Sequence, residues 1–166
     1  MKKYGIYYGS STGTCKDVAG RIAKVLGVAT EDVHDVAKSK PSDVADYEVL
    51  VLGSSTWGAG ELQDDWYDFL AGLESLDLKG KKIALFGVGD ESMSDTFCGA
   101  VGELYKRLKP TGAEFIGFFP ADVYDYSESP AEVDGKIVGL LLDEVNKPEL
   151  TDGRIAKWVE EVKKEA

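Results

Sequence analysis

The sequence predicts an α/β fold in which a five-stranded parallel sheet lies between two layers of helices. Short β-prone runs alternate along the chain with longer segments whose apolar residues recur every three or four positions. The runs Val49–Gly53 and Ile83–Val88 are continuously apolar, which is typical of strands covered on both faces. The chain has 166 residues, a length that suits one domain, so we expect a single domain over residues 1–166.

The first half of the chain contains three strand-like runs and two helical segments. Lys3–Tyr8 is the first β-prone run, and a helix with one apolar face is expected over Asp17–Leu26. Val33–Val36 has a weaker pattern and is expected to be a short edge strand. Val49–Gly53 is the third strand. The second helix is expected where the following apolar residues recur: Trp66, Phe69, Leu70 and Leu73.

The second half continues the alternation. After the strand Ile83–Val88, a third helix is expected to end at Pro110–Gly112, and Phe115–Phe119 again resembles a strand. Thr151 is expected to cap the last helix. The apolar stripe of the third helix is formed by Phe97, Val101, Leu104, Tyr105 and Leu108. The stripe of the last helix is formed by Ile155, Trp158, Val159 and Val162. Because Trp66 and Trp158 fall on such stripes, both are expected in the core.

Three loops of this fold are candidates for function. In open α/β sheets, ligands bind beyond the carboxyl ends of the strands, where the strand order reverses. The loops that follow the first, third and fourth strands are Gly9–Cys15, Ser54–Asp65 and Gly89–Thr96. The chemistry of these loops therefore carries the functional prediction.

The first loop is rich in small hydroxyl residues and leads directly into a helix; its candidate site residues are Ser10, Ser11, Thr12, Gly13, Thr14 and Cys15. The start of a helix presents unpaired N–H groups and a partial positive charge, which favour a bound anion. The loop is not a Walker A motif, because no lysine directly follows its second glycine, and it is not G-x-G-x-x-G. We therefore expect a monophosphate held by neutral donors; the alternative is an ordinary hydroxyl-capped helix start.

This loop resembles the phosphate loop of flavodoxins, which reads roughly T/S-x-T/S-G-x-T after the first strand. Cys15 stands where a hydroxyl is usual, and a thiol is a poorer donor. Its position at a helix start predicts a lowered thiol pKa, which a bound phosphate would raise again. The resemblance covers nearly the whole chain and is to the long-chain type, in which residues 121–138 would be an extra loop that splits the last strand.

The resemblance implies a flavodoxin-like fold with strand order 2-1-3-4-5. It also implies one non-covalently bound FMN, which in this fold lies at the switch between the first and third strands. In the second loop, the candidate cofactor-binding residues are Ser55, Thr56, Trp57, Gly58, Ala59 and Gly60. A Trp between Thr and Gly in a loop favours stacking on a flat ligand, and in flavodoxins the matching Trp covers one flavin face. Gly58 matches the residue whose carbonyl can turn toward the reduced flavin, a turn that glycine permits.

The third loop departs from the flavodoxin pattern. Flavodoxins usually place a Tyr here to cover the other flavin face, whereas this loop has no aromatic residue before Phe97. Met93 is the nearest candidate, since its thioether can lie against a ring. The candidate cofactor-binding residues of this loop are Gly89, Asp90, Met93, Thr96, Phe97 and Cys98.

The net charge of −11 argues against binding to nucleic acid or to anionic membranes, and no apolar run is long enough to cross a bilayer. Charge of this sign favours partners with a basic surface, such as a flavodoxin reductase or another oxidoreductase; solubility alone is the alternative. The acidic residues near the loops are Glu61, Asp64, Asp65, Asp68, Asp90, Glu91 and Asp95. We find no export signal and no cysteine spacing for a metal or a disulfide, and we expect a cytoplasmic monomer without a metal.

The resemblance therefore implies a low-potential one-electron carrier rather than an enzyme. A receiver domain would need carboxylates at the ends of the first and third strands, where this chain has Tyr8–Ser10 and Gly53–Ser55. An FMN-dependent NAD(P)H quinone or nitro reductase is the remaining alternative, although no acid–base pair is evident. His34 is the only histidine, and we expect it on the surface, far from the three loops.

Overall fold

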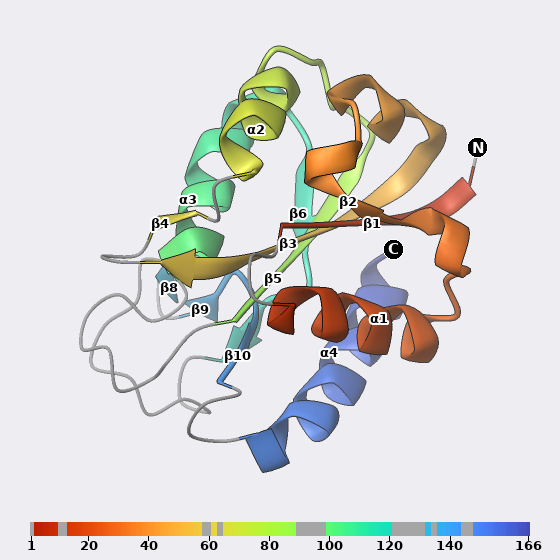
Figure 1. Ribbon diagram of the computed structural model, residues 1–166, viewed down its shortest axis with the longest axis vertical. Helices are drawn as coiled ribbons and strands as arrows, with labels where there is room; N and C mark the ends of the chain where they lie inside the picture. Colours follow the sequence, from red (N-terminus) through yellow and green to blue (C-terminus); the bar gives the residue numbers. More distant parts are fainter. Residues whose placement is uncertain are drawn as a thin grey trace.

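The computed structural model describes residues 2–9, 13–57, 61–62, 65–88, 99–120, 132–133, 136–143 and 148–166. A parallel sheet lies between two layers of helices (Figure 1). Its strands run side by side in the order β10 (Gly139–Leu142), β5 (Lys82–Val88), β3 (Tyr47–Trp57), β1 (Lys2–Gly9) and β2 (Val33–Asp35). All of these pairings are parallel, and the order is the predicted 2-1-3-4-5.

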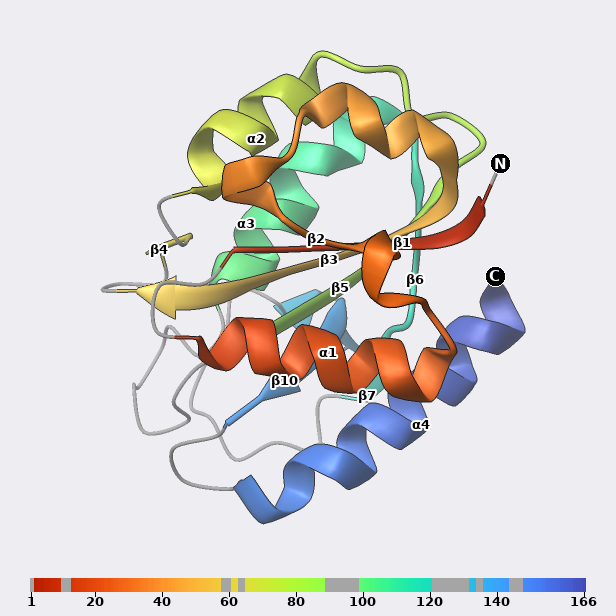
Figure 2. The ribbon, with the colours of Figure 1, turned by 45° about the vertical axis from the view of Figure 1, so that its right-hand side comes forward.

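Two helices cover each face of the sheet, as Figure 2 shows edge-on. Helices α1 (Thr14–Leu26) and α4 (Thr151–Glu165) lie on one face, and α2 (Trp66–Glu74) and α3 (Gly99–Leu108) lie on the other. Successive side chains of a strand point to opposite faces, so each layer has its own apolar core. Short 3₁₀ turns lie at Thr30–Asp32, Val36–Lys38, Pro41–Asp46, Lys109–Thr111 and Pro148–Leu150. None of the described helices has the length and apolar character needed to cross a bilayer.

The fifth strand of the sheet is split, as predicted. β6 (Glu114–Ile116) pairs with the first half of β5, and β10 pairs with its second half. Between them, β7 (Phe119–Pro120), β9 (Lys136–Ile137) and β8 (Glu132–Val133) form a small antiparallel sheet. The predicted strand Phe115–Phe119 is wrong in its extent, because Gly117 has a φ of 77° that interrupts extended backbone.

Two indoles anchor the helices to the sheet. Trp66 and Trp158 are fully buried, which confirms that both belong to the core. Trp66 Nε1 donates to the Gly53 carbonyl at 2.7 Å, and Trp158 Nε1 donates to the Gly117 carbonyl at 2.9 Å. The prediction that Thr151 caps α4 is wrong: Leu150 holds the cap position, and the buried Thr151 hydroxyl has no hydrogen-bond partner among the described residues. The 3₁₀ turn Pro148–Leu150 leads into the helix and moves Thr151 inside its first turn.

The prediction that His34 lies on the surface is also wrong. His34 is half-buried on β2, and its ring stacks on Tyr7 with a centroid distance of 4.8 Å. Its Nε2 lies 2.8 Å from the hydroxyl of Tyr47, which in turn donates to Asp32 at 2.9 Å. The neighbours that bury His34 come from β1 and β3, which are distant in sequence.

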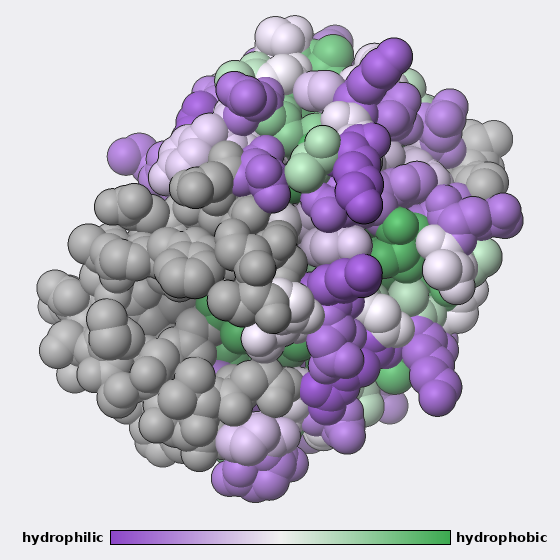
Figure 3. All heavy atoms as spheres, viewed as in Figure 1, coloured by the Kyte–Doolittle hydropathy of each residue, from purple (hydrophilic) through white to green (hydrophobic). Residues whose placement is uncertain are grey.

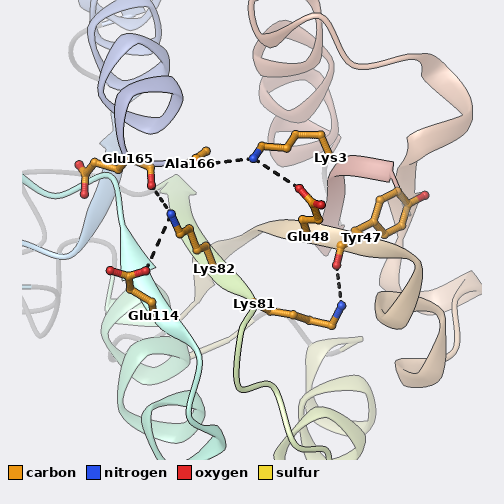
Figure 4. Close-up of polar contacts among 8 residues, drawn as sticks. All are labelled: Lys3, Tyr47, Glu48, Lys81, Lys82, Glu114, Glu165 and Ala166. Carbon is orange, nitrogen blue, oxygen red and sulfur yellow. Dashed lines mark hydrogen bonds and ion pairs between the residues drawn. The ribbon is translucent and has the colours of Figure 1, made fainter.

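Lysines tie the end of α4 to the amino ends of the strands (Figure 4). Lys3 on β1 donates to the main-chain oxygen of Ala166 at 3.2 Å, and Lys82 on β5 donates to that of Glu165 at 2.6 Å. Lys81 donates to the carbonyl of Tyr47 at 2.6 Å. The contacts of Lys3 and Lys82 hold the carboxyl end of α4 against β1 and β5, at the amino ends of these strands.

Candidate functional site

The candidate site is built on one row of paired residues across the sheet. Gly9 at the end of β1 is the register partner of Ser54 on β3, and Ser54 is the partner of Gly87 on β5. β1, β3 and β5 all end at the left-hand edge of the sheet in Figure 1, and in the sequence each of them leads into one of the three predicted loops. β1 is also where the strand order reverses, with β2 on one side and β3 on the other.

Close packing fixes the backbone just before the loops. A Cβ on Gly53 would lie 2.0 Å from the Phe86 ring, so only glycine fits beneath that ring. A Cβ on Gly87 would lie 2.3 Å from Val101 Cγ2 of α3. Ser54 is fully buried between these glycines. These three residues were not among the predicted site residues, although the signal was available, because each apolar run ends in small residues.

The first loop enters α1 through a left-handed glycine. Gly13 caps the helix with φ 91° and ψ −11°, a conformation that strains other residues, and its carbonyl accepts from the Asp17 amide at 3.0 Å. Thr14 and Cys15 are the first two helical residues, so their backbone N–H groups lie at the end of the helix that carries the partial positive charge. The sequence-predicted residues Gly13, Thr14 and Cys15 are therefore brought to the edge of the sheet.

The Cys15 thiol is turned away from that edge, into the core. Its side chain is fully buried and packs with the apolar residues beneath α1, including Val18, Ala19 and Ile22. Burial raises the pKa of the Cys15 thiol to about 12, and a hydrogen bond to the backbone of Gly9 lowers it only in part. The predicted lowering of this pKa is therefore wrong, because loss of solvation outweighs the helix dipole. The signal was available: Cys15 precedes Val18 and Ile22 by three and seven residues, on the same helical face.

The comparisons with known proteins agree with this geometry. The family model described as Flavodoxin matches residues 6–158. This chain belongs to the flavodoxin family. It is 41% identical over 165 residues to a flavodoxin of Synechocystis sp., covering 98% of this chain and 97% of that protein. It is 43% identical over 163 residues to flavodoxin 1 of Escherichia coli K12, covering 97% of this chain and 93% of that protein.

Solved structures give the same result for the fold. The crystal structure of a Fusobacterium nucleatum flavodoxin bound to flavin mononucleotide has a TM-score of 0.89 and 34% identity, and the match covers 99% of each chain. An oxidised flavodoxin 2 from Bacillus cereus has a TM-score of 0.75 and 26% identity over 99% of each chain. Flavodoxins are electron-transfer proteins, not enzymes.

In this member of the flavodoxin family, the second loop is shorter than the sequence suggested. β3 continues through Ser55, Thr56 and Trp57, and Trp57 pairs with Glu61 of the antiparallel strand β4 (Glu61–Leu62). The start of the predicted loop Ser54–Asp65 is therefore strand. Residues 58–60 fall between these two paired strands.

The remaining predicted site residues of this flavodoxin lie outside the described residues. They are Ser10, Ser11 and Thr12 of the first loop, Gly58, Ala59 and Gly60 of the second, and Gly89, Asp90, Met93, Thr96, Phe97 and Cys98 of the third. The described part of the chain contains no group of His, Cys, Asp and Glu side chains that could hold a metal ion.

Proposed function

We propose that this chain, as one flavodoxin-like domain over residues 1–166, holds one FMN non-covalently and carries electrons singly between redox enzymes. The row Gly9–Ser54–Gly87 supports the proposal, because three strands whose following loops have complementary chemistry in the sequence end at one edge, at the strand-order switch. The similarity to a flavodoxin described as bound to flavin mononucleotide, 34% identical over 99% of each chain, supports the choice of cofactor.

The cofactor phosphate would lie in the first loop. Gly13 turns the chain so that the first amides of α1 follow the hydroxyl residues Ser10–Thr12. These neutral donors suit a phosphate dianion, since the helix dipole adds attraction and no lysine is needed. Cys15 would contribute through its backbone N–H, because its thiol lies in the core.

The flavin ring would lie between the second and third loops. Trp57 and Met93 would cover its two faces, with Ser55, Thr56, Ala59, Gly60, Gly89, Asp90, Thr96, Phe97 and Cys98 around it. When bound, FMN would supply one-electron chemistry, and the Gly58 carbonyl would accept a hydrogen bond from a protonated ring nitrogen of the reduced flavin. Pairing of Trp57 with Glu61 supports this role, because it holds both ends of the Gly58–Gly60 segment.

The acidic residues near the three loops would influence both the reduction potential of the flavin and the choice of partner protein. Asp65 and Asp68 are exposed at the start of α2, beside the second loop. Carboxylates there disfavour additional negative charge on a reduced ring, which makes the carrier a strong donor. They also attract partners with a basic surface, such as a flavodoxin reductase or another oxidoreductase. We propose that the protein acts as a monomer in the cytoplasm.

Three measurements test the proposal. Release of the cofactor followed by mass spectrometry is expected to give FMN, and recovery of FAD alone would refute the phosphate-loop assignment. Stepwise reduction followed by absorbance is expected to show a semiquinone between the oxidised and fully reduced forms. Steady-state oxidation of NADPH by the isolated protein would instead indicate a reductase.

A further inference from the structure

A groove lies between helix α1 and the edge strand β2, on the side of α1 that faces away from α4. It has a volume of about 440 Å³, within the range of small-molecule sites. Its floor is apolar and is formed by Tyr8, Ala23, Val28 and Val33. In Figure 3, hydrophobic residues are surrounded by hydrophilic ones in the region of α1 and the segment that leads into β2. We call this feature the α1–β2 groove.

The lining of the groove is positively charged, whereas the chain as a whole is negatively charged. Its described lining contains two lysines, Lys16 and Lys24, and no carboxylate, although the chain has a net charge of −11. Both lysines are exposed, and neither ammonium forms an ion pair with another described residue. Asp35 on β2 is the register partner of the floor residue Tyr8 and, after burial, helps to raise the pKa of Tyr8, but it does not line the groove. The groove therefore offers two cations about 12 Å apart along α1, at 1.5 Å per residue.

A glycine in the middle of α1 keeps the groove open. Gly20 lines it one helical turn after Lys16, and a Cβ built there would meet no atom within 4 Å. Its φ is not in the left-handed region, so neither packing nor backbone conformation requires glycine. Glycine inside a helix is destabilising relative to alanine. Gly20 therefore lowers helix stability and leaves free volume beside the apolar floor, as expected for a position that faces a bound ligand.

We propose that the α1–β2 groove binds a small amphiphilic anion, with an apolar body on Tyr8, Val28 and Val33 and a carboxylate or phosphate at Lys16 or Lys24. The apolar floor supplies most of the affinity, since burial of apolar surface is the dominant favourable contribution. The positive charge of the two lysines favours a ligand with a negatively charged head group. This site is separate from the three loops, because its described lining contains only residues of α1, β1, β2 and the segment between α1 and β2.

The test compares three probes with one apolar chain and different head groups: decanoate, decyl maltoside and decyltrimethylammonium, each below its micelle-forming concentration. Excess FMN is present so that the phosphate loop is occupied. Amide and methyl NMR shifts are expected to saturate with decanoate at Tyr8, Val28 and Val33, and to be weaker with the neutral and cationic probes. Equal binding of all three probes, or decanoate shifts scattered over the surface, would overturn the proposal.

Variants separate the groove from the rest of the surface. Lys16→Gln and Lys24→Gln are each expected to weaken decanoate binding about twofold to fivefold, the range for one exposed ion pair. Gly20→Leu is expected to abolish binding by filling the groove. Gly153→Ala is the matched control, since Gly153 lies in α4 with open space at its Cβ, and it should leave binding unchanged. Unchanged decanoate affinity in the lysine variants would overturn the proposal, whether or not Gly20→Leu folds.

Discussion

His34 Nε2 lies 2.8 Å from the hydroxyl oxygen of Tyr47. The Tyr47 hydroxyl has a single hydrogen, which it donates to Asp32. The contact with His34 therefore requires Nε2 to carry a hydrogen and to donate it to the Tyr47 oxygen. The resulting chain of hydrogen bonds ties the 3₁₀ turn before β2, the edge strand β2 and the start of β3 together.

Replacing Tyr47 with Phe is expected to destabilise the fold by about 1–3 kcal/mol, because buried Asp32 loses a hydrogen-bond donor. The change keeps the ring and its contact with Tyr7. Urea denaturation followed by circular dichroism measures the free energy of unfolding. Tyr67→Phe is the control, since Tyr67 is exposed, and an equal loss in both variants would contradict the role of the Asp32 contact.

Alkaline pH is expected to destabilise the folded protein. Burial, followed by the charge of Tyr47, raises the pKa of Tyr7; burial, followed by the hydrogen bond to Asp32, raises the pKa of Tyr47. The unfolded chain loses these phenol protons first, at a pKa of about 10. Stability is therefore unaffected by these groups below that pH and falls as the pH rises above it. Each tyrosine contributes a slope of up to about 1.4 kcal/mol per pH unit, so Tyr47→Phe should reduce the slope.

Two glycines of the α1 region should respond to alanine in opposite directions. Gly20→Ala is expected to stabilise the protein by roughly 0.5–1 kcal/mol, because alanine is the better helix former and its Cβ meets open space. Gly27→Ala is expected to destabilise it by roughly 1 kcal/mol, because Gly27 ends the helix with a φ of 81°. Thermal unfolding of both variants measures the difference. A loss of stability in Gly20→Ala would show that this position does need glycine.

Removing the Lys82 ammonium should loosen the end of α4. Lys82→Met keeps the apolar stem but removes the hydrogen bond to the Glu165 carbonyl, and we expect a loss of about 0.5–1 kcal/mol. Hydrogen exchange at the last amides of α4 should accelerate more than exchange in α1. Lys163→Met, an exposed change in the same turn, is the control. Equal exchange rates in both variants would contradict the contact.

The Cys15 thiol should resist alkylation while the protein is folded. Its pKa of about 12 leaves almost no thiolate at pH 8, and its side chain is fully buried. In a Cys98→Ser background, the rate of reaction with iodoacetamide is expected to follow the rate of unfolding. Rapid modification in the native state would show that the thiol reaches the loop edge.

The helices and the main strands of the parallel sheet were predictable because their apolar residues are periodic or contiguous in sequence. The strands β4, β7, β8 and β9 were not, because each is only two residues long. The split of the fifth strand was predictable only from the family resemblance, whereas the early end of β6 depends on the conformation of Gly117. His34 could not be placed from its neighbours in sequence, because Tyr7 and Tyr47 bury it from other strands.

The edge that joins the three loops was predictable from the α/β alternation, since parallel strands present their carboxyl ends together. The direction of the Cys15 side chain was also predictable, from the helical face that it shares with Val18 and Ile22, but the predicted pKa rested only on its position at the start of the helix. The α1–β2 groove gave no sequence signal, since its lining combines isolated residues from α1, β1 and β2.

Because the fifth strand is split, the register of the sheet does not depend on the length of the chain between the two halves. Ile116 pairs with Ala84, and Gly139 pairs with Leu85, the next residue of β5. Residues 117–138 therefore intervene between two consecutive positions of the same ladder. A chain joined directly from 116 to 139 would present one uninterrupted strand to β5. The register of the sheet thus does not depend on the length of this segment, although the segment supplies the Gly117 carbonyl that binds Trp158 and the buried side chains of Ile137 and Val138.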